Sequence, residues 1–240
     1  MNPLEIRRLR ERLVAAKRIT ALTGAGLSAA SGVPTFRGSD GLWKNFRPED
    51  LATPEAFRRD PNLVWEWYDW RRRMLATKSP NPGHVALAEM EKRFPGFRLI
   101  TQNVDGLHAL AGSTRMIEMH GNIWKTRCTR CRRVEQNRRV PLPAPPLCSG
   151  CGGLLRPHIV WFGENLEADD LEICFDWLRA AEVFLVVGTS GVVQPAGSFA
   201  GMARDAGAWV VEINPEPTPI SDDSDISLQG SAAEILPLLA

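Results

Sequence analysis

Four of the five cysteines stand in two pairs, Cys128-Thr-Arg-Cys131 and Cys148-Ser-Gly-Cys151, with 16 residues between the pairs. Each pair offers two thiolates, and four thiolates at about 2.3 Å complete the tetrahedral shell of Zn²⁺. A shell without an open position is typical of a structural zinc. Two redox-active pairs are the alternative interpretation. The fifth cysteine, Cys174, lies in an apolar helical pattern, and we interpret it as a packing residue.

Two glycine-rich segments each follow a short apolar run. They are Gly24-Ala25-Gly26-Leu27-Ser28 and Gly188-Thr189-Ser190. Glycine permits a tight strand–helix turn and a close approach of a ligand to the backbone, and a helix N-terminus can receive a phosphate. The third glycine of a GxGxxG fingerprint is missing, because Ala29 takes its position. A turn without a ligand explains one such segment equally well, but two of them predict a ligand at the carboxyl edge of a parallel sheet.

Polar residues follow two further apolar runs. Gln102, Asn103 and Asp105 come after the first, and His120 comes after the second. The amides and the carboxylate could orient a ribose or polarise a carboxamide, although Asn and Asp also cap helices. His120 could serve as a general base, because its ordinary pKa is near neutrality. A purely structural histidine is the alternative.

The remaining sequence predicts alternating strands and helices. Short β-prone runs predict strands over 18–23, 97–101, 116–119, 183–187 and 209–213. Helical spacing predicts helices over 3–17, 65–75, 82–94, 168–181 and 196–206. This alternation indicates an α/β fold with a parallel sheet covered on both faces. Residues 122–158 are poor in apolar side chains, so we interpret them as a metal-held insertion.

Composition excludes several classes of protein. The 240 residues are 44% hydrophobic and 24% charged, which excludes wholesale disorder. No apolar run approaches the roughly 18 residues that span a bilayer, so no membrane partner is expected. Lys plus Arg number 29 against 28 acidic residues, which gives no reason to expect nucleic acid. The N-terminus carries no secretory pattern, so we expect a reducing, cytoplasmic location.

Six motifs occur together in one order: Gly24–Gly38 (GAGLSAASGVPTFRG), Thr101–Asp105 (TQNVD), His120-Gly121, the four paired cysteines, Gly188–Ser190 and Ile213-Asn214. In this order they resemble the sirtuin family of NAD-dependent protein-lysine deacylases, over nearly the whole chain. The resemblance implies a Rossmann-like parallel-sheet domain (1–36, 78–121 and 159–240). It also implies a cofactor loop and helical module at 37–77 and a smaller zinc-binding lobe at 122–158.

The resemblance also implies roles for individual residues, with NAD consumed as a co-substrate and one structural Zn²⁺ on the four paired cysteines. The catalytic residues would be His120, Asn103 and Asp105. NAD would contact Gly24, Ala25, Gly26, Ser28, Thr35, Phe36, Arg37, Trp43, Gln102, Asn103, Asp105, Gly188, Thr189, Ser190, Asn214, Glu216 and Ala232. An acyl-lysine peptide would pair with Val160, Phe162, Gly163 and Glu164 by strand addition.

The implied reaction transfers the acyl group to ADP-ribose. The acyl oxygen attacks C1′ of the nicotinamide ribose and nicotinamide leaves. His120 then deprotonates a ribose hydroxyl, which attacks the acyl-derived carbon, and water releases lysine and 2′-O-acyl-ADP-ribose. Zinc takes no part. Two positions depart from the family pattern: Ala30 stands where many relatives carry Glu, and Thr35 where many carry Asp.

The predicted aromatic helix indicates the acyl group. Helical spacing groups Leu63, Trp67, Trp70 and Met74 in one apolar stripe, and Val64, Tyr68, Arg71 and Leu75 in the next. A partly buried guanidinium suits a carboxylate, whereas an internal ion pair or a solvent-reaching arginine is the alternative. Tyr68-x-x-Arg71 resembles the signature of sirtuins that remove succinyl, malonyl or glutaryl groups. Ala52 is similar to the small residue that widens their acyl pocket. Acetyl-lysine remains a second expected substrate.

Other classes of function remain open at this point. An NAD-dependent dehydrogenase with a structural zinc lobe would need a fuller dinucleotide fingerprint. A zinc-ribbon nucleic-acid-binding protein would use the arginines of the lobe, which otherwise form a solvated face. Transfer of ADP-ribose to another nucleophile is a closer relative of deacylation. We expect acylated-lysine proteins or peptides as partners, and a monomeric chain.

Overall fold

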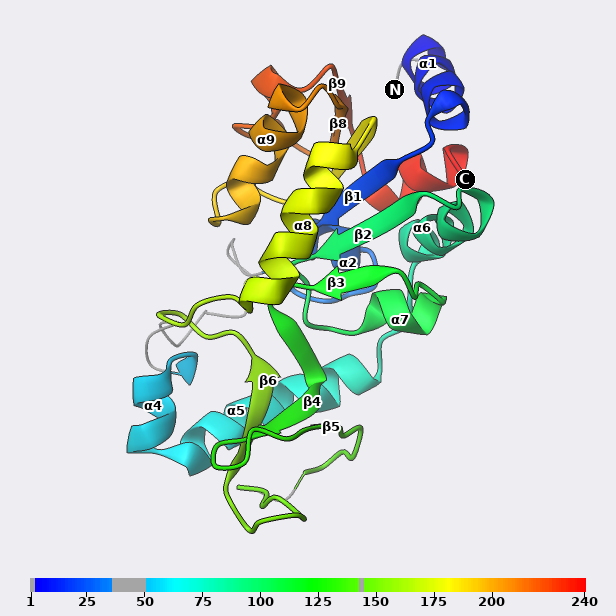
Figure 1. Cartoon of the computed structure of the whole chain (residues 1–240). Helices are drawn as coiled ribbons and strands as arrows, with labels where there is room; N and C mark the ends of the chain where they lie inside the picture. The colour runs from blue at the N-terminus through cyan, green and yellow to red at the C-terminus, as the bar shows by residue number, and fades with distance from the viewer. Residues whose placement is uncertain (1–2, 36–50, 143–144) are drawn as a thin grey trace.

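The computed structural model describes residues 3–35, 51–142 and 145–240 (Figure 1). Its larger sheet has six parallel strands in the order β3-β2-β1-β7-β8-β9. The order runs outward in both directions from the β1–β7 pair, which defines a doubly wound α/β sheet. The strands are β1 (Ile19–Thr23), β2 (Phe97–Thr101), β3 (Met116–Glu118), β7 (Val183–Val187), β8 (Trp209–Asn214) and β9 (Ile226–Gln229).

Helices cover both faces of this sheet, which explains why its central strands β1 and β7 are buried throughout. Ile19 and Ala21 of β1 pack in one cluster with α1, α6 and α10, whereas Leu22 packs in the other with α8 and α9. In Figure 1, α8 and α9 lie in front of the sheet. The helices are α1 (Pro3–Ala15), α2 (Ala25–Ala29), α6 (Pro82–Arg93), α7 (Leu107–Ala111), α8 (Ala168–Ala180), α9 (Phe199–Asp205) and α10 (Ala232–Ile235), with 3-10 turns η1 (Ala196–Ser198), η2 (Ser221–Asp223) and η3 (Leu236–Leu238).

A smaller antiparallel sheet lies at the opposite end of the molecule (Figure 1). Its order is β5-β4-β6, and it packs against α5. The helix begins after Asp60, whose carboxylate accepts the Leu63 N–H at 3.0 Å, and proline follows at the first helical position. These elements are α4 (Pro54–Arg59), α5 (Pro61–Ala76), β4 (Gly121–Cys128), β5 (Val134–Gln136) and β6 (Leu155–Ile159).

Arg72 of α5 connects this helix to β4 and to the segment that follows β5. Arg72 is fully buried and donates to the carbonyl oxygens of Ile123 (3.0 Å), Arg139 (3.1 Å) and Asn137. Burial lowers the pKa of Arg72 to about 10, and Asp69 opposes the shift. Breaking several charge-assisted hydrogen bonds at a buried site is costly, so Arg72 holds β4 and the following segment on the helix.

The structure confirms the α/β class and refines the predicted elements. The helix predicted at 196–206 begins with the 3-10 turn η1 before α9. The first apolar stripe of α5 is not buried throughout, because Leu63 and Trp70 are 39% and 52% exposed. Strands β4, β5, β6 and β9 were not predicted, since each is short or carries mostly polar residues. Within the described ranges, no helix is long and apolar enough to span a membrane.

Candidate active site

The two glycine-rich segments meet where the strand order reverses. Gly24 follows β1 and Gly188 follows β7, and these strands are neighbours. A Cβ on Gly24 would come within 2.7 Å of the Gly188 carbonyl oxygen, and one on Gly26 within 2.8 Å of the Gly188 Cα. Gly188 itself has a φ of +60°, which side chains disfavour. The glycines therefore keep a cradle open at the switch point, which is where doubly wound sheets bind ligands.

The backbone amides of this cradle divide into two groups. The N–H groups of Gly24 and Gly26 donate to the carbonyl oxygens of Val187 and Gly188, so they hold the two turns together. Within the described residues, the Ala25 N–H has no hydrogen-bond partner. A phosphate would therefore meet the Ala25 amide at the start of α2, rather than the amides of the two glycines.

Three polar side chains line the carboxyl edge beside the cradle. The Gln102 amide donates to Thr189 Oγ1 at 2.9 Å, and the Asn214 amide donates to the Thr189 carbonyl at 2.7 Å. These residues follow or end β2, β7 and β8. The structure thus brings together residues that are far apart in the sequence, as the sheet order predicts.

Asp105 lies in a buried hydrogen-bond network. Its carboxylate accepts the Ser28 hydroxyl at 2.7 Å and, from the position before the N-cap residue Gly106, the first N–H of α7, that of Leu107, at 2.8 Å. Asn103 donates to Ser28 Oγ at 3.2 Å and to the Gly24 carbonyl at 3.0 Å. Burial raises the pKa of Asp105, and the two hydrogen bonds oppose that rise. The capping and ligand-site interpretations are thus compatible.

Two buried histidines extend this network, and sequence reasoning missed both. The Asn81 N–H donates to His84 Nδ1 at 3.3 Å, so His84 Nε2 carries the hydrogen and donates to Ser28 Oγ at 3.4 Å. Burial lowers the pKa of His84 to about 4. His108 Nε2 lies 2.9 Å from Thr23 Oγ1, and burial lowers its pKa as well. Both imidazoles are neutral and fix hydroxyl orientations beneath the site.

His120 follows β3, and its two ring nitrogens differ in protonation. Nδ1 lies 3.0 Å from the Gln102 carbonyl oxygen, which can only accept, so Nδ1 carries the hydrogen. Nε2 therefore keeps its lone pair and can receive a proton. Burial lowers the pKa of His120, and the hydrogen bond to Gln102 partly opposes this. His120 is thus a neutral base at neutral pH.

This pKa direction predicts the acid limb of the pH–rate profile. Burial favours neutral imidazole, so the base form persists below the ordinary histidine pKa of about 6.5 and is lost as pH falls through the lowered value. We expect kcat/KM to decline with a midpoint below about pH 6.5. Initial rates between pH 4.5 and 8 would measure it, and a midpoint above about 7 would contradict the assignment of the base.

Of the residues expected at an acyl pocket, Tyr68 and Arg71 lie on α5, and Ala52 lies just before α4. Trp161 Nε1 donates to the Tyr68 hydroxyl at 2.9 Å, and the Phe162 N–H donates to the Ala52 carbonyl at 3.0 Å. Ala52, Tyr68 and Arg71 are all buried, at 5%, 1% and 5% exposed. The Arg71 guanidinium lies 4.7 Å from the Trp67 ring centroid and 5.6 Å from that of Tyr68.

Charge and burial have opposite effects on the ionisation of Arg71 and Tyr68. Burial lowers the pKa of Arg71, whereas Tyr68 and Asp105 raise it. Burial also raises the pKa of Tyr68, so its hydroxyl keeps its hydrogen. Arg71 and Tyr68 therefore place a desolvated cation beside a hydroxyl group, a pair that suits a carboxylate.

The segment after β6 has an open backbone edge. Gly163 has a φ of +83°, and a Cβ there would meet no atom within 4 Å. Among the described residues, the backbone groups of Gly163 and Asn165 have no hydrogen-bond partner. Phe162 is 57% exposed, and Val192 and Val193 are 43% exposed. An uncovered backbone edge that carries an exposed apolar side chain, Phe162, suits an extended peptide.

The four paired cysteines converge at the tip of the smaller lobe. All four sulfur atoms lie within 4.8 Å of one another, with Cys128–Cys151 at 3.5 Å and Cys131–Cys148 at 3.7 Å. Tetrahedral zinc with 2.3 Å bonds requires sulfur separations of about 3.8 Å. Arg130 beside Cys151 lowers the pKa of that thiol to about 6, which favours the thiolate. The donor set fits a closed zinc site, and Cys174 is buried in the core of the larger domain.

Some predicted residues stand apart from these groups. Phe36, Arg37 and Trp43 lie outside the described residues. Glu216 is exposed beyond β8, and Ala232 is buried at the start of α10. Trp161 is a residue that sequence reasoning missed, although it stands inside the segment predicted to pair with a peptide.

Comparison with known proteins agrees with this geometry. The profile of the Sir2 family matches residues 24–195. A protein from Aquifex aeolicus named NAD-dependent protein deacylase is 57% identical over 216 residues, 90% of each chain. One of the same name from Pyrococcus furiosus is 51% identical over 225 residues, 91% of this chain and 90% of its own.

Solved structures show the same likeness. A Sir2 homolog–NAD complex superposes with a TM-score of 0.91 at 46% identity, covering 97% of this chain and 91% of its own. A Sir2 mutant with a deacetylated p53 peptide and 3′-O-acetyl-ADP-ribose gives 0.86 at 32% identity, covering 98% and 96%. The chain belongs to the Sir2 family.

Proposed function

We propose that this protein is an NAD-dependent protein-lysine deacylase that removes short acyl groups ending in a carboxylate, such as succinyl and malonyl, together with acetyl. The observation that carries the acyl class is Arg71, a buried guanidinium 5.6 Å from the centroid of the Tyr68 ring. Family membership and the relatives named NAD-dependent protein deacylase support the general reaction. NAD, when bound, supplies ADP-ribose as the acceptor of the acyl group.

Different residues of the chain bind the co-substrate, orient it and accept the proton. The glycine cradle, Thr189 and Asn214 hold the co-substrate at the switch point. Asn103 and Asp105 orient its ribose and carboxamide, and Ser28 fixes Asp105. His120 Nε2 accepts the proton of a ribose hydroxyl, while Nδ1–H stays on the Gln102 carbonyl. The cysteine site has no open position, so it stabilises the lobe and takes no part in the chemistry.

The acyl specificity follows from the energetics of a buried cation. Burial disfavours the Arg71 charge, and an arriving carboxylate would offset that cost through two parallel N–H···O bonds. An acetyl group offers no such charge. The Tyr68 hydroxyl, held by Trp161, provides a further donor near the same place. The pocket should therefore favour a dicarboxylic acyl group over acetyl.

Substituting Arg71 tests this assignment. Arg71→Met should lower kcat/KM for a succinyl-lysine peptide by about a hundredfold, because one desolvated charge-assisted pair is worth about 2–3 kcal/mol. The rate on the matched acetyl-lysine peptide should change much less, since acetyl does not use the cation. Nicotinamide release and product masses with both peptides would measure the two rates.

Arg59→Met provides the matched control, because Arg59 is an exposed arginine of α4 outside this pocket. It should leave the succinyl-to-acetyl ratio unchanged. An unchanged succinyl rate in Arg71→Met would show that Arg71 does not read the acyl group. Absence of nicotinamide release with every acyl peptide would reject the deacylase function itself.

A further inference from the structure

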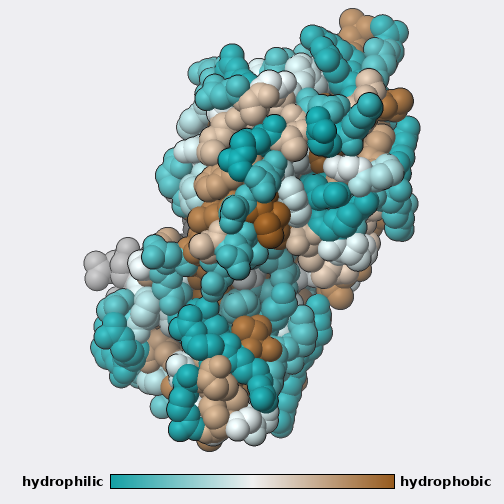
Figure 2. All heavy atoms as spheres, viewed as in Figure 1, coloured by the Kyte–Doolittle hydropathy of each residue, from teal (hydrophilic) through white to brown (hydrophobic). Residues whose placement is uncertain are grey.

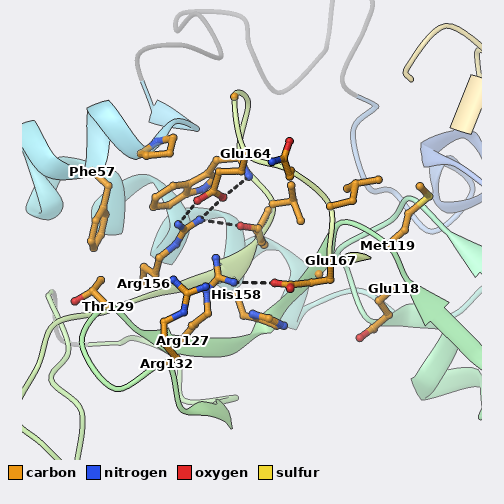
Figure 3. Close-up of a pocket in the computed structure, with 18 of the residues that line it drawn as sticks. Phe57, Glu118, Met119, Arg127, Thr129, Arg132, Arg156, His158, Glu164 and Glu167 are labelled. Carbon is orange, nitrogen blue, oxygen red and sulfur yellow. Dashed lines mark hydrogen bonds and ion pairs between the residues drawn. The ribbon is translucent and has the colours of Figure 1, made fainter. Parts of the chain in front are cut away.

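A groove of about 710 Å³ runs from the peptide-pairing segment toward the zinc-binding lobe (Figure 3). Gly163 and Asn165 line one end of it, and Arg127 and Arg132 of the lobe line the other. Gly163, around which a Cβ would meet no atom within 4 Å, is one of the residues that line this space. A peptide that pairs with the segment around Gly163 would place the residues that flank its acyl-lysine along the groove. The side chains that line the groove would then contact those flanking residues.

The lobe is strongly cationic although the whole chain is nearly neutral. Residues 121–159 hold eight Lys or Arg residues and one acidic residue, Glu135. Hydrophilic residues predominate on the face of this lobe drawn in Figure 2. Like charges on a small lobe repel one another unless an anion joins them. The groove is where this positive charge approaches the peptide site.

Two arginines carry that charge into the groove. The Arg127 side chain is only 15% exposed and pairs with Glu167 at 3.1 Å, as the dashed line in Figure 3 shows. Arg132 is exposed, and its guanidinium has no hydrogen bond or ion pair within the described residues.

Glu167 differs from its partner in exposure and position. Its side chain is 59% exposed and stands on the segment just before α8, beyond the peptide-pairing residues. A pair with one exposed member is weakly bound, because water and salt screen it. A carboxylate from a substrate that enters the groove can therefore replace Glu167 as the partner of Arg127 at little cost in free energy.

We propose that this groove selects substrates with an acidic side chain close to the acyl-lysine, with Arg127 and Arg132 as its receiving cations. Glu167 occupies the Arg127 position until the substrate arrives. The inference rests on the proposed deacylase function and adds a sequence preference to it. The preferred class of substrate is an acyl-lysine peptide with a neighbouring Asp or Glu.

The test uses the full-length protein and pairs of succinyl-lysine peptides that differ only by Glu or Gln at one flanking position. With the wild-type chain, Glu should raise kcat/KM about tenfold at one position, and added salt should weaken that preference. Arg127→Met and Arg132→Met should each reduce the preference to about twofold or less. Arg139→Met, which removes an exposed arginine of the same lobe outside the groove, should keep it.

Two further variants, one that removes the competing carboxylate and one that reverses the charge of a groove arginine, test the same preference. Glu167→Gln should lower KM for the Glu peptide, because the competing carboxylate is gone, whereas Glu172→Gln on the exposed side of α8 should not. Arg132→Glu should turn the preference toward a Lys-containing peptide. Zinc content, measured for every variant, separates loss of the groove charge from loss of the lobe.

Several outcomes would overturn the inference. One is a wild-type chain with no Glu preference at any position, and another is a preference that survives both arginine variants. Inhibition by a mixed-sequence oligonucleotide, lost in both variants while the peptide preference stays, would assign the arginines to nucleic acid. A short succinyl-lysine substrate without flanking residues tests the deacylase function alone, so its turnover distinguishes failure of the inference from failure of the function.

Discussion

Replacing His120 with alanine is expected to slow formation of deacylated peptide by about 10²–10⁴-fold, the usual contribution of a general base. The reason lies in the hydrogen bond from Nδ1 to the Gln102 carbonyl, which leaves Nε2 as the proton acceptor. Cleavage of nicotinamide precedes this proton transfer in the proposed reaction, so base exchange with labelled nicotinamide should fall far less. Product masses and label incorporation would give the two rates.

The companion variant His120→Asn separates the base from the hydrogen bond. Its side-chain amide can still donate toward the Gln102 carbonyl, but it cannot accept a proton at neutral pH. If His120 is the base, both variants are slow at similar thermal stability. Full activity in His120→Asn would instead show that the hydrogen bond to Gln102 is the whole role of the residue.

The position of the candidate site followed from the sequence because strand order and chain order are linked. Gly24 and Gly188 each follow an apolar run, and parallel strands place such turns at one edge. That reasoning placed them correctly without any knowledge of contacts. It could not show that the glycine amides join the two turns, because the pairing of Gly26 with Gly188 depends on packing between distant segments.

The residues that sequence reasoning missed act through tertiary contacts. The sequence pattern indicates only that His84 is a residue of an amphipathic helix. In the structure its imidazole hydrogen-bonds to Ser28, which lies 56 residues away in the sequence. Arg72 follows the proposed specificity residue Arg71, and only the packed lobe shows that it binds three backbone carbonyls. Periodicity distinguishes a buried face from an exposed one, but it does not reveal a partner on another element.

The exposed residues of α5 also show that helical periodicity alone does not predict which apolar residues are buried. The spacing grouped Leu63 and Trp70 with Trp67, but of these three only Trp67 is buried, in the cluster that also contains Tyr68 and Leu75. The width of a buried stripe depends on the size of the neighbouring element, which the helix sequence does not contain. The neighbouring stripe is buried throughout, and the role of Arg71 within it stays a prediction.

Removal of zinc is expected to unfold the tip of the smaller lobe while its base stays folded. The buried cluster at the tip consists of Cys128, Cys148 and Leu155, with Cys151 packed beside it, so the metal ligands are themselves the core. At the base, Ile123 and Trp124 pack on α5 in a separate apolar cluster. A structural zinc contributes on the order of 10 kcal/mol in small metal-held folds, far more than one leucine can supply.

This division gives the experiment a spatial readout. Chelation, or Cys148→Ser, should release the bound zinc and open trypsin sites at Arg130, Arg132 and Arg133, whereas α5 should stay protected. Cys174→Ala is the matched control: it alters a buried thiol of the larger domain and should retain zinc and trypsin resistance. A zinc-free lobe that resisted trypsin as well as the metal-bound form would show that packing alone holds the tip. Because the segment proposed to pair with a peptide follows β6 directly, deacylation should be lost when the tip of the lobe unfolds, although zinc takes no part in the proposed reaction.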